Sequence, residues 1–353
     1  MREFGSDFHK CDFDFRAESN YFDVFGGVRF YACGRHAIDA IILHEGFKRI
    51  WMPAYFCYEV IDHIAKTGIE VLSYDDNPLR NDDDDVVASL PFREGDVLLR
   101  MNYFGLRSKR SNKNISIPVI EDHTHGLYTQ WAICSDADYC VASVRKTLPV
   151  ASGGVLWSPK HLSLPENIQP SDICQDMAKI RYEAMALKAE YLKNNRCNKV
   201  SSIDGSLKDE FRQKFLISEE MIDNLNLSGM DLTTKGIISS FNVRQWTGLK
   251  TDNWYNAYDQ LRKKFNILRP KEDVCWHPYS LIFYFDSAEN RNDFRDYLIR
   301  NCIYPAILWP IPNDVKYKNA LDFSKRMLSI HCDMRYSTQA IDEMCQIINR
   351  YND

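Results

Sequence analysis

Residues 119–126, Val-Ile-Glu-Asp-His-Thr-His-Gly, are the stretch of sequence that says most about the fold. A short apolar run ends in the carboxylate of Asp122, and His125 follows three residues later. Apolar runs of this length are typical of buried parallel strands. The carboxyl ends of such strands form the edge of an α/β sheet at which ligands bind. The stretch therefore predicts an α/β fold with Asp122 at a ligand-binding edge.

Short apolar runs alternate with helical stretches on both sides of this segment. The apolar spacing predicts helices at residues 35–44 and 59–66. Strands are predicted at residues 50–52, 69–74, 96–101, 117–120, 138–142 and 154–157. This alternation favours a mainly parallel sheet that is covered by helices on both faces.

The length of 353 residues favours two domains. Residues 171–195 form a long charged helix between the two parts, and residues 194–207 are polar, which is typical of a connection. Strand, helix, strand, strand and helix then follow at residues 281–285, 288–300, 303–308, 327–330 and 338–349. We expect a large domain at residues 1–264, with an N-terminal arm and bridging helices from about residue 171. We expect a smaller C-terminal α+β domain at residues 265–353.

The composition excludes several classes of protein. Hydrophobic residues make up 45% and charged residues 26%, as in ordinary globular chains, and the net charge of −5 argues against nucleic acid as a partner. No apolar run approaches the ~20 residues that span a bilayer, so we expect no membrane insertion. The start shows no signal peptide, and the 11 cysteines are scattered without a zinc-type quartet. We therefore expect a cytoplasmic protein with reduced thiols and no metal.

Two further motifs carry chemistry. The predicted strand at residues 138–142 leads into Ser143-Val-Arg-Lys146 and then into a Gly-Gly pair at 153–154. A lysine amine at a strand end can form a Schiff base, and a serine hydroxyl beside it can contact a phosphate. Cys33-Gly34-Arg35 opens a helix, and the free N–H groups of a helix start favour phosphate.

Each motif alone is weak. Asp122 could simply cap a turn, Lys146 could be a solvated surface lysine, and His125 could be a structural histidine. Together they supply a lysine, an acid and phosphate donors at the edge of one sheet. Pyridoxal 5′-phosphate (PLP) needs these three kinds of group.

In this order, the motifs resemble the fold-type I PLP enzymes, and most closely the DegT/StrS family of sugar aminotransferases. The resemblance covers nearly the whole chain, through the segments CGRHAIDAI (33–41), MPAYFCYEV (52–60), NYFG (102–105), VIEDHTHG (119–126), SVRKTLPVASGG (143–154), SFNVR (240–244) and LSIHCDMRYS (328–337). It implies a large domain with a mainly parallel seven-stranded sheet between helices, and a smaller C-terminal domain.

The resemblance also implies roles for three residues of the reaction centre. Lys146 would hold PLP covalently and, once freed from it, act as the base that moves the substrate proton. Asp122 would pair with the pyridinium nitrogen, because a nearby carboxylate favours the charged ring. His125 would lie near the ring hydroxyl.

The phosphate is implied to lie at Gly34, Arg35 and Ser143, and Asn242 is implied to reach the phosphate of a neighbouring subunit, which makes a homodimer the expected assembly. Two departures from the family pattern leave alternatives open. The family usually has Gly-Thr or Gly-Ser where this chain has Gly34-Arg35, so Arg35 either contacts the phosphate or points away. The spacing from Ser143 to Lys146 is shorter than usual.

Other residues near these motifs also have two interpretations. Tyr55, Phe56 and Tyr58 surround Cys57, which stands where the family has its ring-stacking aromatic, and any of the three could take that role or belong to the core. Arg145 either lowers the proton affinity of the adjacent lysine or pairs with a structural carboxylate. His331 and Arg335 either contact substrate or tie the two domains together.

The implied activity is transfer of an amino group from an amino acid, with glutamate as the expected donor, to a nucleotide-linked keto sugar. Such reactions serve surface polysaccharide or natural-product sugar biosynthesis. The alternatives are a PLP-dependent lyase or dehydratase on the same fold, and a non-catalytic PLP-binding paralogue. In the sugar dehydratase branch of the family a histidine replaces the lysine, so Lys146 disfavours that branch.

Overall fold

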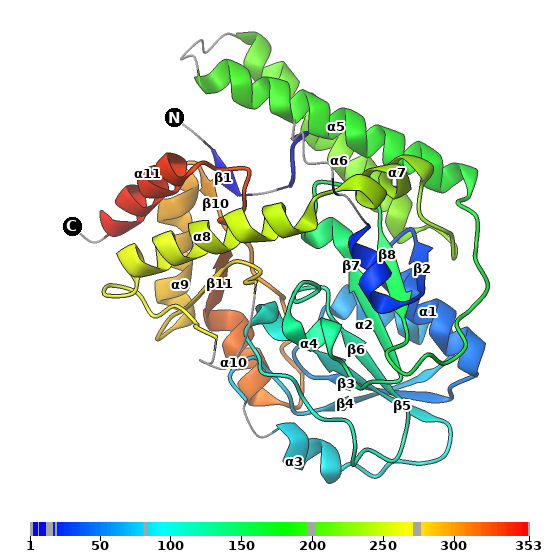
Figure 1. Cartoon of the computed structure of the whole chain (residues 1–353). Coiled ribbons are helices and arrows are strands. Elements are labelled where there is room, and N and C mark those ends of the chain that lie inside the picture. The colour runs from blue at the N-terminus through cyan, green and yellow to red at the C-terminus, as the bar shows by residue number, and fades with distance from the viewer. Residues whose placement is uncertain are drawn as a thin grey trace.

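A computed structural model describes residues 3–5, 7–11, 17, 20–80, 83–196, 202–270 and 277–351. Its central element is a seven-stranded sheet with the strand order β2-β8-β7-β6-β5-β3-β4 (Figure 1). The strands are β2 (Val28–Tyr31), β3 (Arg49–Pro53), β4 (Glu70–Tyr74), β5 (Asp96–Met101), β6 (Val119–Asp122), β7 (Tyr139–Ser143) and β8 (Gly154–Trp157).

Six of these strands run in one direction, and β8 runs in the other. β3, β4, β5, β6 and β7 pair in parallel. β8 is antiparallel to both of its neighbours, β7 and β2, so β2 has the same direction as β7. The predicted mainly parallel sheet is therefore confirmed. Because β6 and β7 are parallel neighbours, Asp122 and Ser143, at their carboxyl ends, lie at the same edge of the sheet.

Apolar cores lie on both faces of the sheet, as expected for strands that alternate their side chains. Ile120 belongs to one core and Val119 to the other. The helices of this part are α1 (Gly34–Glu45), α2 (Tyr58–Ala65), α3 (Asp83–Ala88) and α4 (Gln130–Ile133), with short 3₁₀ turns η1 (Tyr21–Phe25), η2 (Tyr103–Gly105) and η3 (Val144–Lys146).

Two long helices form a hairpin beside the sheet (Figure 1). They are α5 (Asp172–Arg196) and α6 (Ser202–Asp223). The first was predicted, but the predicted polar connection at 194–207 is wrong in extent, since α6 already begins at Ser202. The polar first turns belong to an amphipathic helix whose Phe211 and Phe215 are buried near Tyr191 of α5, and this tertiary contact is not visible locally.

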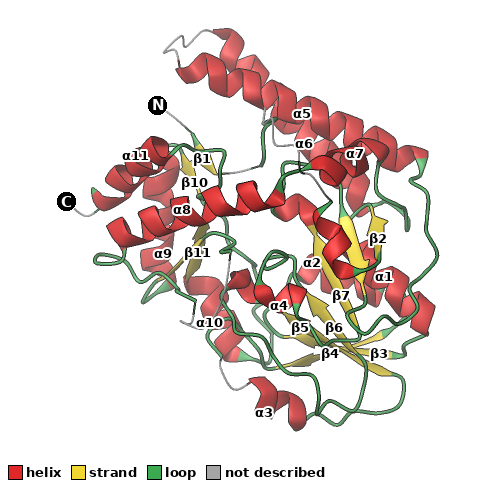
Figure 2. Cartoon of the chain, in the orientation of Figure 1, coloured by secondary structure: helices red, strands yellow, loops and turns green. Residues whose placement is uncertain are grey.

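The C-terminal unit contains β9 (Leu281–Tyr284), α9 (Ala288–Arg300), β10 (Ile303–Tyr304), α10 (Lys318–Arg326), β11 (Met327–Ile330) and α11 (Thr338–Asn349) (Figure 2). α7 (Leu232–Ser240) and α8 (Val243–Leu261) lead into it, and β1 (Phe4–Gly5) pairs in parallel with β10. The predicted strand at 303–308 is shorter in the structure.

One apolar core joins segments that are far apart in the sequence. Phe4 of β1, Trp254 and Leu261 of α8, and Leu298 and Ile341 of the C-terminal unit are all buried in it. The division into residues 1–264 and 265–353 stays a prediction. Among the described residues, no helix combines the length and the apolar character that a membrane span requires.

Candidate active site

The carboxyl edge of β6 and β7 forms the base of the candidate site. Asp122 is 7% exposed, and its Oδ1 accepts a hydrogen bond of 2.8 Å from the backbone N–H of Thr124. The Thr124 hydroxyl oxygen accepts one of 3.0 Å from the N–H of Ser143. Burial raises the pKa of Asp122, and a cation beside the carboxylate would favour its ionised form.

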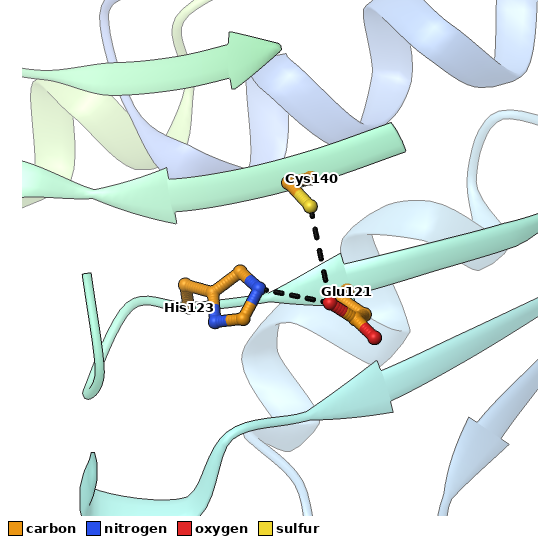
Figure 3. Close-up of side chains that lie close together, drawn as sticks. All are labelled: Glu121, His123 and Cys140. Atoms are coloured by element: carbon orange, nitrogen blue, oxygen red, sulfur yellow. Dashed lines mark hydrogen bonds and ion pairs between the residues drawn. The ribbon is translucent and has the colours of Figure 1, made fainter. Parts of the chain in front are cut away.

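A buried polar network lies beside this edge, where the side chains of Glu121, His123 and Cys140 come close together (Figure 3). The carboxylate of Glu121 accepts hydrogen bonds from Asn112 Nδ2 (2.7 Å) and Ser135 Oγ (2.6 Å) and lies 3.1 Å from His123 Nε2. Burial opposes ionisation of Glu121, but the hydrogen bonds from His123, Ser135 and Asn112 outweigh burial and lower its pKa.

Glu121 and His123, with Cys140, offer three possible metal-ligand atoms within 4.8 Å of one another. Protein groups already engage both carboxylate oxygens, and Asn102 Nδ2 donates to His123 Nδ1 at 3.2 Å. The cluster is therefore better described as a hydrogen-bonded support for β6. The expected absence of metal stays a prediction.

Lys146 follows β7 in the turn η3 and lines a cavity of about 320 Å³. The N-terminal arm, the α5/α6 hairpin and the C-terminal unit contribute other walls, through Asp7, Arg181 and His331 among others. The positive charge of Arg145 lowers the pKa of the Lys146 amine, which is exposed at the cavity. A larger share of the amine is therefore uncharged and nucleophilic at neutral pH than for an ordinary lysine.

Arg145 both lowers the proton affinity of Lys146 and pairs with a carboxylate, the two alternatives that the sequence left open. It is the main cause of the lowered lysine pKa, and its Nη1 donates to Glu219 Oε1 of α6 at 2.8 Å. Arg181 Nη1 of α5 donates to the same oxygen at 2.5 Å, and its Nη2 donates to Asp7 Oδ1 at 3.3 Å. Burial would raise the pKa of Glu219, but the two guanidiniums hold it well below its usual range.

His125 lies among aromatic rings. Its ring is nearly parallel to those of Phe104 and Trp309, with centroids 5.3 and 5.1 Å away, and its centroid lies 4.2 Å from that of Tyr279. Its buried Nδ1 has no hydrogen-bond partner in the described part of the chain. Burial, with the charges of Lys146 and Lys250, lowers its pKa well below the usual value, so the ring is neutral.

Trp309 is a site residue that sequence reasoning missed, because it comes from a loop more than 180 positions beyond His125. Of the aromatics considered for ring stacking, Tyr55 and Phe56 are buried, with centroids 5.5 and 5.7 Å from that of Trp309. Tyr58 is partly exposed at the start of α2. The identity of the ring-stacking aromatic stays open.

The N-terminus of α1 approaches the sheet edge closely. A Cβ on Gly34 would lie 3.2 Å from Cβ of Ser143, and one on Gly154 would lie 2.0 Å from the carbonyl oxygen of Cys33. Cys33 is the N-cap residue but forms no side-chain capping hydrogen bond, and its thiol interacts instead with the side chain of His36. The structure therefore brings Gly34 and Ser143 together around a helix start that has no side-chain cap.

Two predicted phosphate residues form hydrogen bonds to other parts of this subunit. Arg35 Nη2 donates to the carbonyl oxygen of Ile222 at 3.0 Å and to Asp223 Oδ1 at 2.5 Å, so its guanidinium reaches α6. Asn242 is the N-cap of α8, and its Oδ1 accepts a hydrogen bond of 3.1 Å from the N–H of Gln245. Among the described residues, Asn242 has no hydrogen bond to the other predicted site residues.

Arg335 lines the cavity and forms hydrogen bonds to two parts of its wall. Its Nε and Nη2 donate to Asp333 at 2.9 Å each, and its Nη1 donates to the carbonyl oxygen of Asp7 at 3.0 Å. It therefore joins the C-terminal unit to the N-terminal arm. His331 lines the same cavity, and burial lowers its pKa to about 4.

Lys250 of α8 is a second lysine near the site that the sequence did not single out. It is 6% exposed, and its Nζ lies 5.2 Å from the ring centroid of Tyr279. Burial lowers its pKa to about 8. Only its position on the buried face of α8, between Trp246 and Trp254, distinguishes it in the sequence.

These groups fit PLP. Lys146 is open to a cavity, the carboxylate of Asp122 stands at the sheet edge, and His125 has an unpartnered ring nitrogen. Because Gly34 has no Cβ, the start of α1 can lie close to Ser143. The backbone N–H groups of this helix start could bind a phosphate. Lys146, Asp122, His125, Ser143 and Gly34 would hold the cofactor.

No protein-family model matches the sequence, and no curated protein matches it either. Solved structures do match. An aminotransferase described as DegT DnrJ EryC1 StrS, from Brucella abortus, has a TM-score of 0.60 at 11% identity and covers 94% of this chain and 87% of its own. Aminotransferase TlmJ from Streptoalloteichus hindustanus has a TM-score of 0.62 at 13% identity, with coverages of 93% and 87%. Spr1654 from Streptococcus pneumoniae, in its PLP-form, has a TM-score of 0.58 at 14% identity, with coverages of 91% and 86%.

The chain has the fold of these aminotransferases. Coverage above nine-tenths of this chain means that the sheet, the helices around it and the C-terminal unit are shared. The expected fold-type I architecture is therefore confirmed, and the resemblance to the DegT/StrS enzymes holds at the level of the fold.

Proposed function

We propose that this protein is a PLP-dependent aminotransferase. The observation that carries the proposal is Lys146, which opens into a cavity at the same sheet edge as Asp122 and the start of α1. The solved structures with this fold support it, since they include aminotransferases and a PLP-form.

When bound, PLP supplies an electron sink that allows an amino group to move between substrates. Lys146 would hold PLP through its uncharged amine, and the charge of Arg145 increases the fraction of the amine in that form. Once released from the cofactor, the amine would move the proton at the substrate carbon as a general base. Asp122 would favour the protonated ring nitrogen, because opposite charges stabilise each other at a buried position. His125, neutral and held by aromatic rings, donates or accepts a hydrogen bond through Nδ1.

Cofactor binding by Lys146 is tested directly by adding PLP to the protein. The wild type should turn yellow, and borohydride reduction should leave the cofactor on the peptide that contains Lys146, as mass spectrometry will show. Lys146→Ala should bind no PLP covalently. Lys160→Ala, which removes a half-exposed lysine paired with Asp138, serves as the matched control and should behave as the wild type. A Lys146→Ala protein that still transaminates would contradict the proposal.

For the substrates, we propose an amino acid donor, glutamate, and a nucleotide-linked keto sugar acceptor, in surface polysaccharide or natural-product sugar biosynthesis. Support comes from DesI, a structure with this fold (TM-score 0.59, 11% identity) that was solved in the presence of its TDP-sugar product. Transamination should yield 2-oxoglutarate and aminated sugar in equal amounts. Loss of water from the sugar without 2-oxoglutarate would instead favour the lyase or dehydratase alternative, and PLP binding with no turnover would favour the non-catalytic paralogue.

For the assembly, we propose a cytoplasmic homodimer in which Asn242 reaches the partner's cofactor. Lys146→Ala and Asn242→Ala should each be inactive alone. When the two are mixed and allowed to exchange subunits, each mixed dimer regains one intact site, so about a quarter of wild-type activity should return. If the mixture stays inactive although subunits exchange, Asn242 acts within its own subunit.

A further inference from the structure

Two arginines near the candidate site form ion pairs with carboxylates that lie one turn apart on the same helix. Arg145 pairs with Glu219 and Arg35 pairs with Asp223, both on α6. Residues four positions apart lie on one face of a helix, so α6 presents both carboxylates to the same side.

Both guanidiniums have unused donors. In the described part of the chain, Glu219 is the only hydrogen-bond partner of Arg145, and the Nε atoms of Arg145 and Arg35 are buried without a partner. The Arg145 side chain is only 8% exposed. Arg181 differs, because its Nη atoms donate to Ser218, Glu219 and Asp7. Buried donors without acceptors are costly, and Arg145 lines the cavity that Lys146 also lines, so a ligand in the cavity can supply an acceptor to this guanidinium.

The position of Arg145 suggests which ligand. It stands two residues after Ser143, which contacts Gly34 at the start of α1, and directly before Lys146. The charges of Cys33 and Arg35 at that helix start act on Arg145. Arg145 therefore lines the same cavity as Lys146 and is close enough to the helix start to interact electrostatically with its residues.

We propose that Arg145 binds the phosphate of PLP, with Arg35 as a second cation, and that Glu219 and Asp223 are positioning residues that orient the two guanidiniums. The inference rests on the proposed function, that this site takes PLP. A phosphate ester carries a charge of about −1.5 to −2 at neutral pH. A guanidinium has five N–H donors, so it can bind a carboxylate and a phosphate together.

The test compares PLP with pyridoxal, which lacks the phosphate, in equilibrium binding to the cofactor-free protein. Arg145→Gln should weaken PLP binding about 10- to 100-fold more than it weakens pyridoxal binding, the usual effect of losing a charged hydrogen bond. Any effect of Arg145 on the pKa of Lys146 acts on both compounds and cancels in their ratio, and pyridoxal binding that is retained shows that the variant is folded. Inorganic phosphate should raise the melting temperature of the wild type more than that of Arg145→Gln.

Arg181→Gln is the matched control, because it loses the same Glu219 partner but has its other donors engaged. Its ratio of PLP to pyridoxal affinity should equal that of the wild type. The proposal is overturned if Arg145→Gln keeps the wild-type ratio, or if both arginine variants lower the ratio equally. These outcomes differ from a wild type that binds neither compound, which would instead refute the proposed function.

Discussion

Lys250 illustrates what burial does to a single charged residue. Its amine lies among His125, His277, His331, Asp333 and Arg335, and burial lowers its pKa from 10.5 to about 8. Between these two pH values the unfolded chain holds a proton that the folded chain has lost, so stability rises with pH. Below pH 8 the folded protein carries the full cost of the buried charge.

Lys250→Met should therefore stabilise the protein at pH 7, by about 1–3 kcal/mol, and the gain should shrink as the pH approaches 10. Urea unfolding at both pH values measures this difference. Lys235→Met, at an exposed position of α7, should show no such pH dependence. A Lys250→Met protein less stable at pH 7 than the wild type would mean that the ammonium makes a favourable interaction in the core.

At the residue scale, the sequence predicted the groups that follow strand ends and missed those that arrive from elsewhere. Asp122 and Lys146 could be found because a short apolar strand places its next residues at a sheet edge. Glu219 and Trp309 could not, since nothing near them in the sequence indicates which distant residue they contact.

At the scale of elements, the close approach of β8 to α1 depends on Gly154. A Cβ at this position would lie 2.0 Å from a backbone oxygen, which cannot move without shifting the helix start. Gly154→Ala should lower the free energy of unfolding by about 1–3 kcal/mol, the usual cost of overpacking, as chemical denaturation will show.

Gly27→Ala is the control for this change, because no atom lies within 4 Å of its Cβ position. It should be close to neutral. Equal stability of the two variants would show that α1 can shift away from β8 at little cost. The close approach of α1 to β8 would then not depend on Gly154.

Elements with strong local periodicity were predicted well. The helices at 288–300 and 338–349 and the strands at 154–157 and 327–330 have the bounds that the sequence predicts. The start of α6 was missed because its first turns are polar, and α10 was missed altogether. In both helices, packing against distant parts of the chain stabilises the helical conformation. The local composition alone does not indicate these contacts.

At the scale of the whole molecule, the N-terminal arm (residues 3–11, apart from position 6) contacts both the α5/α6 hairpin and the C-terminal unit. The carbonyl oxygen of Asp7 accepts from Lys188 of α5 and from Arg335 of the C-terminal unit, at 2.5 and 3.0 Å. The N–H of Lys10 donates to the carbonyl oxygen of Met185 at 2.9 Å. The arm thus forms part of the cavity wall while it links the α5/α6 hairpin to the C-terminal unit.

Phe4 anchors this arm, since it is 1% exposed in the core of the C-terminal unit. Phe4→Ala should cost about 3–5 kcal/mol, the usual loss for a buried phenylalanine, and should release the arm. Limited proteolysis should then cut the arm faster than in the wild type. Val24→Ala, at a side chain 55% exposed, should leave the cleavage rate unchanged. Equal rates for Phe4→Ala and the wild type would show that the polar contacts suffice to hold the arm.

The pairing of β1 with β10 also sets an order for assembly on the ribosome. Phe4 is synthesised about 300 residues before its strand partner Ile303. At 5–20 residues per second, the arm waits about 15–60 s for that partner. The large sheet can form meanwhile, so the N-terminal arm takes its place in the wall of the cavity around Lys146 only after β10 has been made.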